Sequence, residues 1–280
     1  MAKNFFILFI STILLIGCST NKEQFGESTI ENATGTALSK DEFSKIRSLN
    51  NETFDTVNFV SREKVGLKYR LYRPKQQKTC KSFPLVIVYH GSGRPIGSDN
   101  SSQLGVLPKL FASAEIQDKY PAYVLAPQFS ERSSDYETDN KRNLLYSKPR
   151  ASLNSVMQLI DSLKSNLNID SKRIYVVGYS MGGSTAINSL ASRPDLFAAG
   201  ISISGIPQFD KTEKLKTIPI WLIHGLDDTE NPISSDEQFY KEMSTNIRFW
   251  KLKGTTHDNI FTTTILGETL PEWLFKQHKK

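Results

Sequence analysis

The 280-residue chain has only two cysteines, Cys18 and Cys80, and only four histidines. Two cysteines allow one disulfide at most, so a small scaffold held together by several disulfides is excluded. Cys80 lies in a polar segment at 75–81, which we expect to be a surface loop without a catalytic role. No group of histidines and carboxylates has the spacing of metal ligands, and we expect neither a metal nor another cofactor.

The chain also lacks an apolar run long enough to cross a bilayer, which takes ~20 residues. The apolar run at residues 5–16 has twelve, follows Lys3 and is followed by small residues, which is typical of an export signal. It ends in Leu15-Ile16-Gly17-Cys18, which resembles the lipobox of bacterial lipoproteins. The resemblance implies a signal peptide at 1–17 and a Cys18 that carries acyl chains such as palmitate. The alternative is an ordinary secretory signal in which Cys18 is incidental.

An acylated Cys18 would hold the protein on a membrane, because several acyl chains together bind a bilayer firmly whereas one binds only marginally. The lipobox resemblance therefore places the protein in the bacterial cell envelope, lipid-anchored and facing outside the cytoplasm. It also leaves the mature chain without a partner cysteine for an internal disulfide.

Clustered charge of one sign is absent as well. The formal net charge is +6, yet the lysines and arginines are scattered and form no basic helix or stripe of basic and aromatic residues. We expect a solvated basic surface and no nucleic-acid partner.

Residues 18–50 are rich in Ser, Thr, Asn, Glu and Lys, and we expect a flexible tether with one short helix at 40–49. Residues 51–280 are predicted to form one domain. An antiparallel pair at 56–60 and 68–72 opens it, and the apolar spacing at 153–167 is that of a helix. Short apolar runs predict buried strands at 83–89, 123–126, 174–177, 198–202, 218–223 and 248–252. This alternation predicts an α/β fold with a mostly parallel central sheet and helices on both faces.

The strand at 174–177 is followed by Gly178-Tyr179-Ser180-Met181-Gly182 and then by small residues that suit a helix. A strand, a G-x-S-x-G turn and a helix together present a serine hydroxyl at the carboxyl edge of a sheet. The G-x-S-x-G pattern alone is common by chance, so the strand before it and the helix after it are what indicate a catalytic serine. We predict Ser180 to be a catalytic nucleophile.

Two later strand ends supply partners for Ser180. An acid that orients a catalytic histidine is expected after the strand at 218–223, where Asp227 and Asp228 compete. Asp228 is favoured because it lies three residues after Gly225 and four before Pro232, and Asp227 is left as a loop-capping acid. The base must follow the acid in the order typical of such triads. His257 fits, because the other histidine beyond Asp228 lies in the terminal tail.

A fourth strand end carries His90-Gly91-Ser92-Gly93. In hydrolases with a strand-turn-helix nucleophile, a backbone N–H in this loop and the N–H after the nucleophile bind the oxyanion of the tetrahedral intermediate. These donors would be the main-chain N–H groups of Ser92 and Met181. We expect His90 to orient the loop by hydrogen bonding and to take no part in catalysis.

Taken together, these motifs resemble the α/β-hydrolase superfamily, in particular esterases related to carbohydrate esterase family 1 and polyhydroxybutyrate depolymerases. The similarity extends to the group labelled predicted peptidase or phospholipase/carboxylesterase-like, and it spans about residues 55–277. The segments that carry it are 84–93, 97–100, 103–104, 120–128, 170–183, 193–199, 224–232, 254–258 and 272–274. The resemblance implies a serine esterase that works through an acyl-enzyme, with Ser180 as nucleophile, Asp228 as acid and His257 as base.

Substrate contacts are less well indicated. Arg94 and Gln128 are weaker candidates, and the long polar segment at 128–150 is expected to line or cover the site. The loops at 93–97 and 129–136 depart from the pattern of the relatives, so the resemblance names no substrate beyond a small-molecule or saccharide ester. The alternatives are a serine peptidase of the same fold and a catalytically silent surface protein that binds glycans or partners.

Overall fold

The computed structural model describes residues 28–34, 39–75, 82–93 and 95–279. The predicted signal peptide, Cys18, Cys80 and Arg94 therefore lie outside the described residues. In the described part of the chain, no helix is both long and apolar enough to cross a bilayer.

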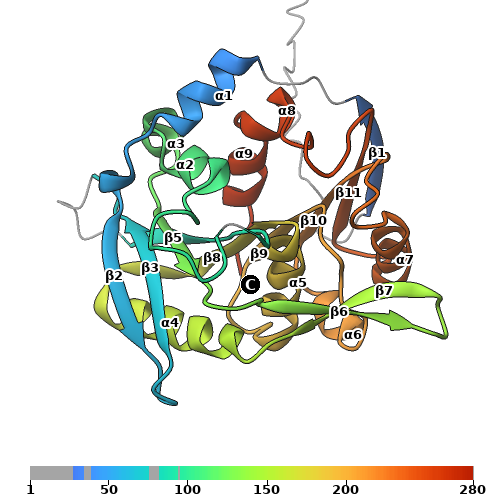
Figure 1. Ribbon diagram of the computed structural model, residues 1–280, viewed down its shortest axis with the longest axis horizontal. Helices are drawn as coiled ribbons and strands as arrows, with labels where there is room; N and C mark the ends of the chain where they lie inside the picture. The colour runs from blue at the N-terminus through green and yellow to red at the C-terminus, as the bar shows by residue number, and fades with distance from the viewer. Residues whose placement is uncertain (1–27, 35–38, 76–81, 94, 280) are drawn as a thin grey trace, which may run out of the picture.

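A nine-stranded sheet forms the centre of the molecule, in the order β1-β11-β10-β9-β8-β4-β5-β3-β2 (Figure 1). The strands from β1 to β5 in this order run parallel, β3 pairs antiparallel with β5, and β2 pairs antiparallel with β3. The strands are β1 (Thr29–Thr34), β2 (Asp55–Val60), β3 (Gly66–Tyr72), β4 (Phe83–Tyr89), β5 (Tyr123–Gln128), β8 (Ile169–Tyr179), β9 (Ala199–Ile203), β10 (Ile220–Gly225) and β11 (Ile247–Lys253). The predicted mostly parallel sheet, with its opening antiparallel pair, is confirmed.

Helices cover both faces of this sheet, as Figure 1 shows. One face packs against α4 (Ser152–Asn166), α5 (Met181–Ser192), α6 (Thr212–Leu215) and α7 (Ser234–Met243). The other face packs against α1 (Lys40–Arg47), α2 (Val106–Ala112), α3 (Ala114–Lys119), α8 (Thr263–Leu266) and α9 (Thr269–Phe275). A short 3₁₀ helix at Asn51–Thr53 leads into β2.

The continuous apolar run of β4 follows from its central position. All seven of its residues are buried, and Leu85, Ile87 and Tyr89 belong to the core on the α4 and α5 side. Val86 and Val88 point to the opposite face and join the core around α2. A strand covered on both faces needs apolar side chains at every position, because successive side chains point to opposite faces.

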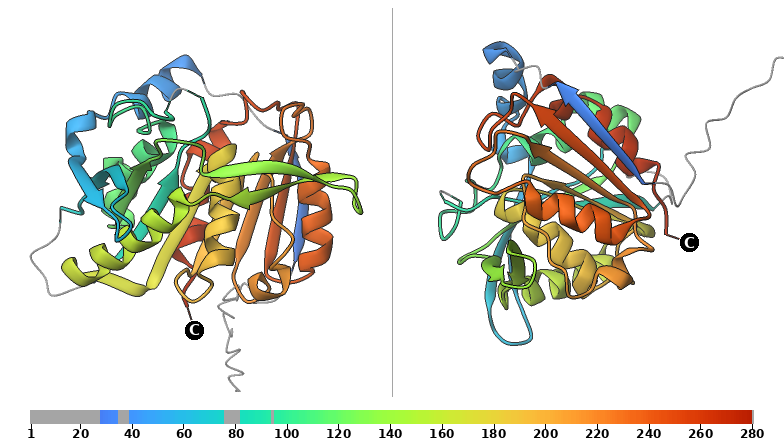
Figure 2. Two further views of the ribbon diagram at one scale, coloured as in Figure 1. Left: turned by 60° about the horizontal axis from the view of Figure 1, so that its bottom comes forward. Right: turned by 90° about the vertical axis from the view of Figure 1, so that its right-hand side faces the viewer.

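The N-terminal segment differs from the tether that we predicted at 18–50. Residues 29–34 form the edge strand β1, which pairs in parallel with β11, and Figure 2 shows the two side by side. Glu31 accepts hydrogen bonds from Trp250 Nε1 at 2.9 Å and from Arg248 at 3.1 Å. The predicted helix at 40–49 is present as α1, which packs against the core through Phe43 and Ile46. The folded part of the chain thus includes residues well before 51.

The polar segment at 128–150 also has more structure than expected. It contains a β-hairpin of β6 (Ser134–Asp139) and β7 (Leu144–Pro149), separate from the main sheet (Figures 1 and 2). Ser133 and Ser134 lie within hydrogen-bond distance of Thr185 Oγ1, and Tyr136 Oη lies 3.1 Å from Ser184 Oγ. The hairpin is therefore held against the first turns of α5.

Candidate active site

Ser180 occupies a sharp turn between β8 and α5. Its backbone has φ +57° and ψ −125°, a conformation that a residue with a side chain rarely adopts. A hydrogen bond of 2.9 Å from its N–H to the carbonyl of Ile203 helps to hold this conformation. Strain of this kind persists only where the surroundings enforce it, and it is frequent at functional sites.

The two glycines of the motif allow this turn to be made. A Cβ on Gly178 would lie 2.1 Å from the carbonyl oxygen of Gly182, and a Cβ on Gly182 would lie 2.2 Å from that of Tyr89. The start of α5 therefore packs backbone to backbone against the ends of β8 and β4. Larger residues at either position would force the turn apart.

Three side chains meet at the carboxyl edge of the sheet, from the ends of β8, β10 and β11. Ser180 Oγ lies 2.8 Å from Nε2 of His257, and Nδ1 of the same ring lies 2.8 Å from Oδ2 of Asp228. Each of the three residues is at least nine-tenths buried. The sequence reasoning chose these three residues, and the structure brings them into one hydrogen-bonded chain.

The structure also separates the two competing acids. Asp227 is exposed, whereas Asp228 is buried and faces His257. Oδ1 of Asp228 accepts hydrogen bonds from the backbone N–H groups of Glu230 at 3.0 Å and Asn231 at 2.9 Å. Burial alone would raise the pKa of Asp228, but hydrogen bonds from His224, from the Asn231 N–H and from His257 hold it well below its usual range. Asp228 is therefore ionised at neutral pH.

His257 is held from a second side by Tyr179, the residue before Ser180. Its hydroxyl donates a 2.9 Å hydrogen bond to the carbonyl of His257, and the two ring centroids are 5.1 Å apart. Tyr179, the first variable residue of the G-x-S-x-G motif, thus helps to hold His257 in place. The sequence reasoning missed this contact, because nothing in the local pattern indicates which way this tyrosine points.

The loop after β4 reaches the same place. A Cβ on Gly91 would lie 3.4 Å from Cβ of Ser180, so this loop passes directly beside the hydroxyl-bearing residue. Ser92 follows in the exposed part of the loop, and Met181 is the first residue of α5. Their backbone N–H groups are the two that the sequence assigned to an oxyanion hole.

His90 orients this loop, in agreement with the expectation from the sequence. Its Nε2 accepts a 3.1 Å hydrogen bond from the N–H of Phe129, so Nδ1 carries the proton and donates to the carbonyl of Gly91 at 2.7 Å. Burial lowers the pKa of His90, which keeps the ring neutral.

The side chain of Gln128, which the sequence predicts to contact substrate, instead faces a neighbouring loop. Its side chain is buried, donates a hydrogen bond to the carbonyl of Pro95 and accepts one of 3.4 Å from Ser98 Oγ. Its amide is thus used to hold the loop at 95–98. Arg94, the other predicted contact, lies outside the described residues.

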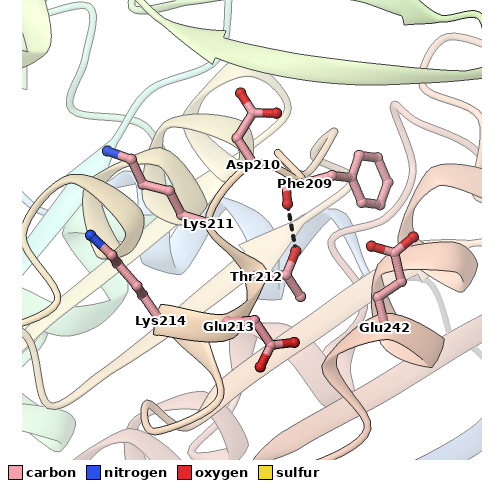
Figure 3. Close-up of a pocket in the computed structure, with 7 residues that line it drawn as sticks. All are labelled: Phe209, Asp210, Lys211, Thr212, Glu213, Lys214 and Glu242. Carbon is pink, nitrogen blue, oxygen red and sulfur yellow. Dashed lines mark hydrogen bonds between the residues drawn. The ribbon is translucent and has the colours of Figure 1, made fainter.

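A pocket of about 410 Å³ lies beside α6 and α7, and Figure 3 shows its charged lining. Ser180, His257 and Asp228 do not line it, so it is separate from the site around Ser180. Within the ranges that the structure describes, no group of three or more His, Cys, Asp or Glu side chains could hold a metal ion. The pocket residues are Phe209, Asp210, Lys211, Thr212, Glu213, Lys214 and Glu242.

Comparison with known proteins agrees with this geometry. Residues 131–253 match the prolyl oligopeptidase family, a stretch that includes Ser180 and Asp228. A bifunctional acetylxylan esterase/xylanase from Neocallimastix patriciarum is 34% identical over 86 residues, which are 31% of this chain and 13% of that protein. Cutinase est1 from Thermobifida alba is 35% identical over 117 residues, 40% of this chain and 38% of the cutinase. The chain thus spans well under half the length of these relatives.

Solved structures extend the similarity over most of the chain. The crystal structure of a thermostable esterase is 30% identical, with a TM-score of 0.73, and the match covers 82% of this chain and 64% of that one. A ferulic acid esterase from Anaeromyces mucronatus matches with a TM-score of 0.59 over 85% of this chain and 96% of its own. At 13% identity the latter shows the fold alone. The chain has an α/β-hydrolase fold and is similar in sequence and structure to esterases.

Proposed function

We propose that the protein is a serine carboxylic ester hydrolase that uses Ser180, His257 and Asp228 as a catalytic triad. The observation that carries this proposal is the unbroken hydrogen-bonded chain from Ser180 Oγ through His257 to Asp228, with both distances 2.8 Å. A hydroxyl bonded to an imidazole that is itself oriented by an ionised carboxylate is the arrangement that activates a serine.

The reaction proceeds in two acyl transfers. His257 Nε2 takes the proton of Ser180 while Oγ attacks the ester carbonyl, and the N–H groups of Ser92 and Met181 stabilise the oxyanion. The imidazolium then gives its proton to the leaving alcohol. A water molecule, deprotonated by the same His257, attacks the acyl-enzyme; the bond from the acyl carbon to Ser180 Oγ breaks, His257 returns the proton to Oγ, and the acid is released. Asp228 stays ionised throughout and stabilises the imidazolium.

Acyl groups on carbohydrates are the substrate class that we favour. Two proteins that match this chain are named acetylxylan esterases, at 34% and 29% identity over 86 and 94 residues. A peptidase is the second candidate, because residues 131–253 match the prolyl oligopeptidase family. Both reactions use the same triad and differ in the leaving group, an alcohol or an amine.

Turnover of matched substrates separates these functions. The purified chain is assayed on p-nitrophenyl acetate, on acetylated xylo-oligosaccharides and on peptide p-nitroanilides, with Ser180→Ala as the control. We expect ester turnover that the substitution lowers by at least ~10³-fold. Turnover of the peptides alone would favour the peptidase, and the absence of any turnover would favour the silent binding protein.

We also propose that Cys18 carries the lipid anchor of an exported protein. The lipobox-like Leu15-Ile16-Gly17-Cys18 supports this proposal. Because β1 runs parallel to the strands that end at the site, Thr29 lies at the edge of the sheet opposite Ser180. The anchored end would then enter the domain on the side away from the site. Cys18→Ser should abolish incorporation of a labelled fatty acid and release the protein from the membrane fraction, whereas a Cys18→Ser protein that remains labelled would contradict the anchor.

A further inference from the structure

A second pair of a histidine and a carboxylate lies directly behind Asp228. His224, near the end of β10, and Asp236, in the first turn of α7, both have fully buried side chains. Nδ1 of His224 lies 2.7 Å from Oδ2 of Asp236. The other ring nitrogen, Nε2, lies 2.8 Å from the carbonyl oxygen of Asn231 and 3.3 Å from Oδ2 of Asp228.

That carboxylate oxygen of Asp228 is the one that also faces Nδ1 of His257. The polar contacts of Ser180, His257 and Asp228 therefore continue from Asp228 to His224 at 3.3 Å and end at Asp236. The described geometry links five side chains from β8, β10, α7 and the loops after β10 and β11.

The surroundings of His224 determine where its protons lie. Nε2 faces two acceptors, the Asn231 carbonyl and the Asp228 carboxylate, so it must carry a hydrogen. Nδ1 faces a carboxyl oxygen of Asp236 at 2.7 Å, and two unprotonated atoms would repel each other at that distance. One proton therefore lies between Nδ1 and Oδ2. Whichever atom holds it, the pair of His224 and Asp236 has no net charge.

Electrostatics favour retention of this proton at neutral pH. Burial alone would lower the pKa of His224, but hydrogen bonds to Asp228 and Asp236 raise it to about 10. Burial also raises the pKa of Asp236. Asp228 then carries the one net negative charge of the buried cluster, and this charge is balanced when His257 becomes an imidazolium.

We propose that His224 and Asp236 are positioning residues of the active site: His224 donates its Nε2–H to the Asp228 oxygen that His257 uses, and Asp236 keeps that donor protonated. The inference rests on the proposed function, because it assigns a role within the same site. The shared hydrogen bond fixes the rotamer of Asp228. It also weakens the attraction between the carboxylate and the imidazolium that forms during the reaction. The proton held between His224 and Asp236 does not move during the reaction.

The acid limb of the pH profile of kcat/KM reports the protonation of the essential base in the free enzyme. We therefore compare wild-type protein with His224→Leu, Asp236→Leu and Asp236→Asn on p-nitrophenyl acetate, alongside the unfolding temperature of each. The titratable groups that face His257 are Tyr179 of β8 and Asp228 and Glu230 of the loop after β10. Asp258 acts electrostatically on Tyr179, and His224 and Asp236 lie behind Asp228.

We expect His224→Leu and Asp236→Leu to move the acid limb upward by about one pH unit and to lower kcat by ~10-fold or more. An asparagine at position 236 can still donate to Nδ1 and leave the hydrogen on Nε2. Asp236→Asn should therefore restore most of what Asp236→Leu loses. An acid limb that stays in place in folded His224→Leu and Asp236→Leu proteins would overturn the proposal and leave the pair a purely structural role.

A second measurement uses the wild-type protein and does not depend on its catalytic activity. In ¹⁵N-histidine-labelled wild-type protein, the two-bond ¹H–¹⁵N spectrum should show His224 protonated on Nε2, with no titration near the ordinary histidine value of about 6.5. A His224 that titrates there, or that carries its only proton on Nδ1, would overturn the inference. A protein inactive on every ester overturns the proposed function instead, while this spectrum still tests the His224–Asp236 pair.

Discussion

Gly178 and Gly182 approach each other so closely that a Cβ on the first would lie 2.1 Å from the carbonyl oxygen of the second. This contact joins the end of β8 to the first turn of α5 and holds Ser180 at φ +57° between them. The geometry of the serine thus depends on two residues that contribute no side chain.

Gly178→Ala and Gly182→Ala should both destabilise the protein, by about 1–3 kcal/mol in the free energy of unfolding, because the backbone must move to admit a methyl group. Ester hydrolysis should fall further than stability, since the turn that presents Ser180 is displaced. Gly66→Ala is a matched control, because the space around Gly66 is open. Thermal unfolding measures the loss of stability, and kcat/KM measures the loss of activity. If Gly178→Ala or Gly182→Ala behaves like Gly66→Ala, the close approach of the two glycines is contradicted.

The two adjacent acids after β10 should behave very differently. Asp228→Asn leaves a neutral amide beside His257 and should lower kcat on the order of 10³–10⁴-fold, because the imidazolium loses its counter-charge and the ring its required tautomer. Asp227→Asn changes an exposed side chain next in sequence and should leave kcat within about twofold of wild type. Steady-state kinetics on one ester compares the pair, and equal losses would show that the acid has been assigned to the wrong residue.

Stability should depend on pH through His224. Its pKa in the folded protein, about 10, lies above the value of about 6.5 expected when unfolded. A raised pKa contributes stability that is complete below about pH 6.5 and is lost as the pH rises towards 10. The unfolding temperature of wild-type protein should therefore fall more steeply across this window than that of His224→Gln. Parallel curves for the two proteins would show that His224 binds no extra proton on folding.

The edge strand β1 should contribute to folding although it precedes the predicted domain. A chain that starts at Ser39 lacks β1 and exposes the edge of β11, so we expect a loss of about 1 kcal/mol or more and a tendency to self-associate through that edge. A chain that starts at Ser28 keeps the strand and serves as the control. Thermal unfolding and light scattering compare the two, and indistinguishable proteins would mean that β1 is dispensable.

The hydrogen-bonded grouping of Ser180, His257 and Asp228 could be predicted from the sequence, because each of the three follows an apolar strand and carries a local signal. The strand β1 could not, since it is short and polar and its partner β11 lies more than 200 residues away. The hairpin of β6 and β7 could not be predicted either, because its strands show no apolar alternation. The sequence predicts Gln128 as a substrate contact, whereas it ends β5 and its side chain faces the loop at 95–98.

The pair of His224 and Asp236 shows a further limit of the sequence. His224 belongs to the marked segment at 224–232 and Asp236 lies four residues beyond it, yet their role depends on complete burial and on a hydrogen bond between β10 and α7. A polar residue within a buried apolar strand, such as His224, is the signal that could have directed attention to it.

The central claim is that Ser180 becomes acylated during ester hydrolysis. The most direct measurement is to mix the protein with p-nitrophenyl acetate, quench with acid during the burst of p-nitrophenol and map the acetylated peptide by mass spectrometry. We predict one acetyl group on Ser180 in the wild-type protein and none in Ser180→Ala. Hydrolysis that continues undiminished in Ser180→Ala, or an acetyl group found on another residue at the rate of turnover, would contradict the account.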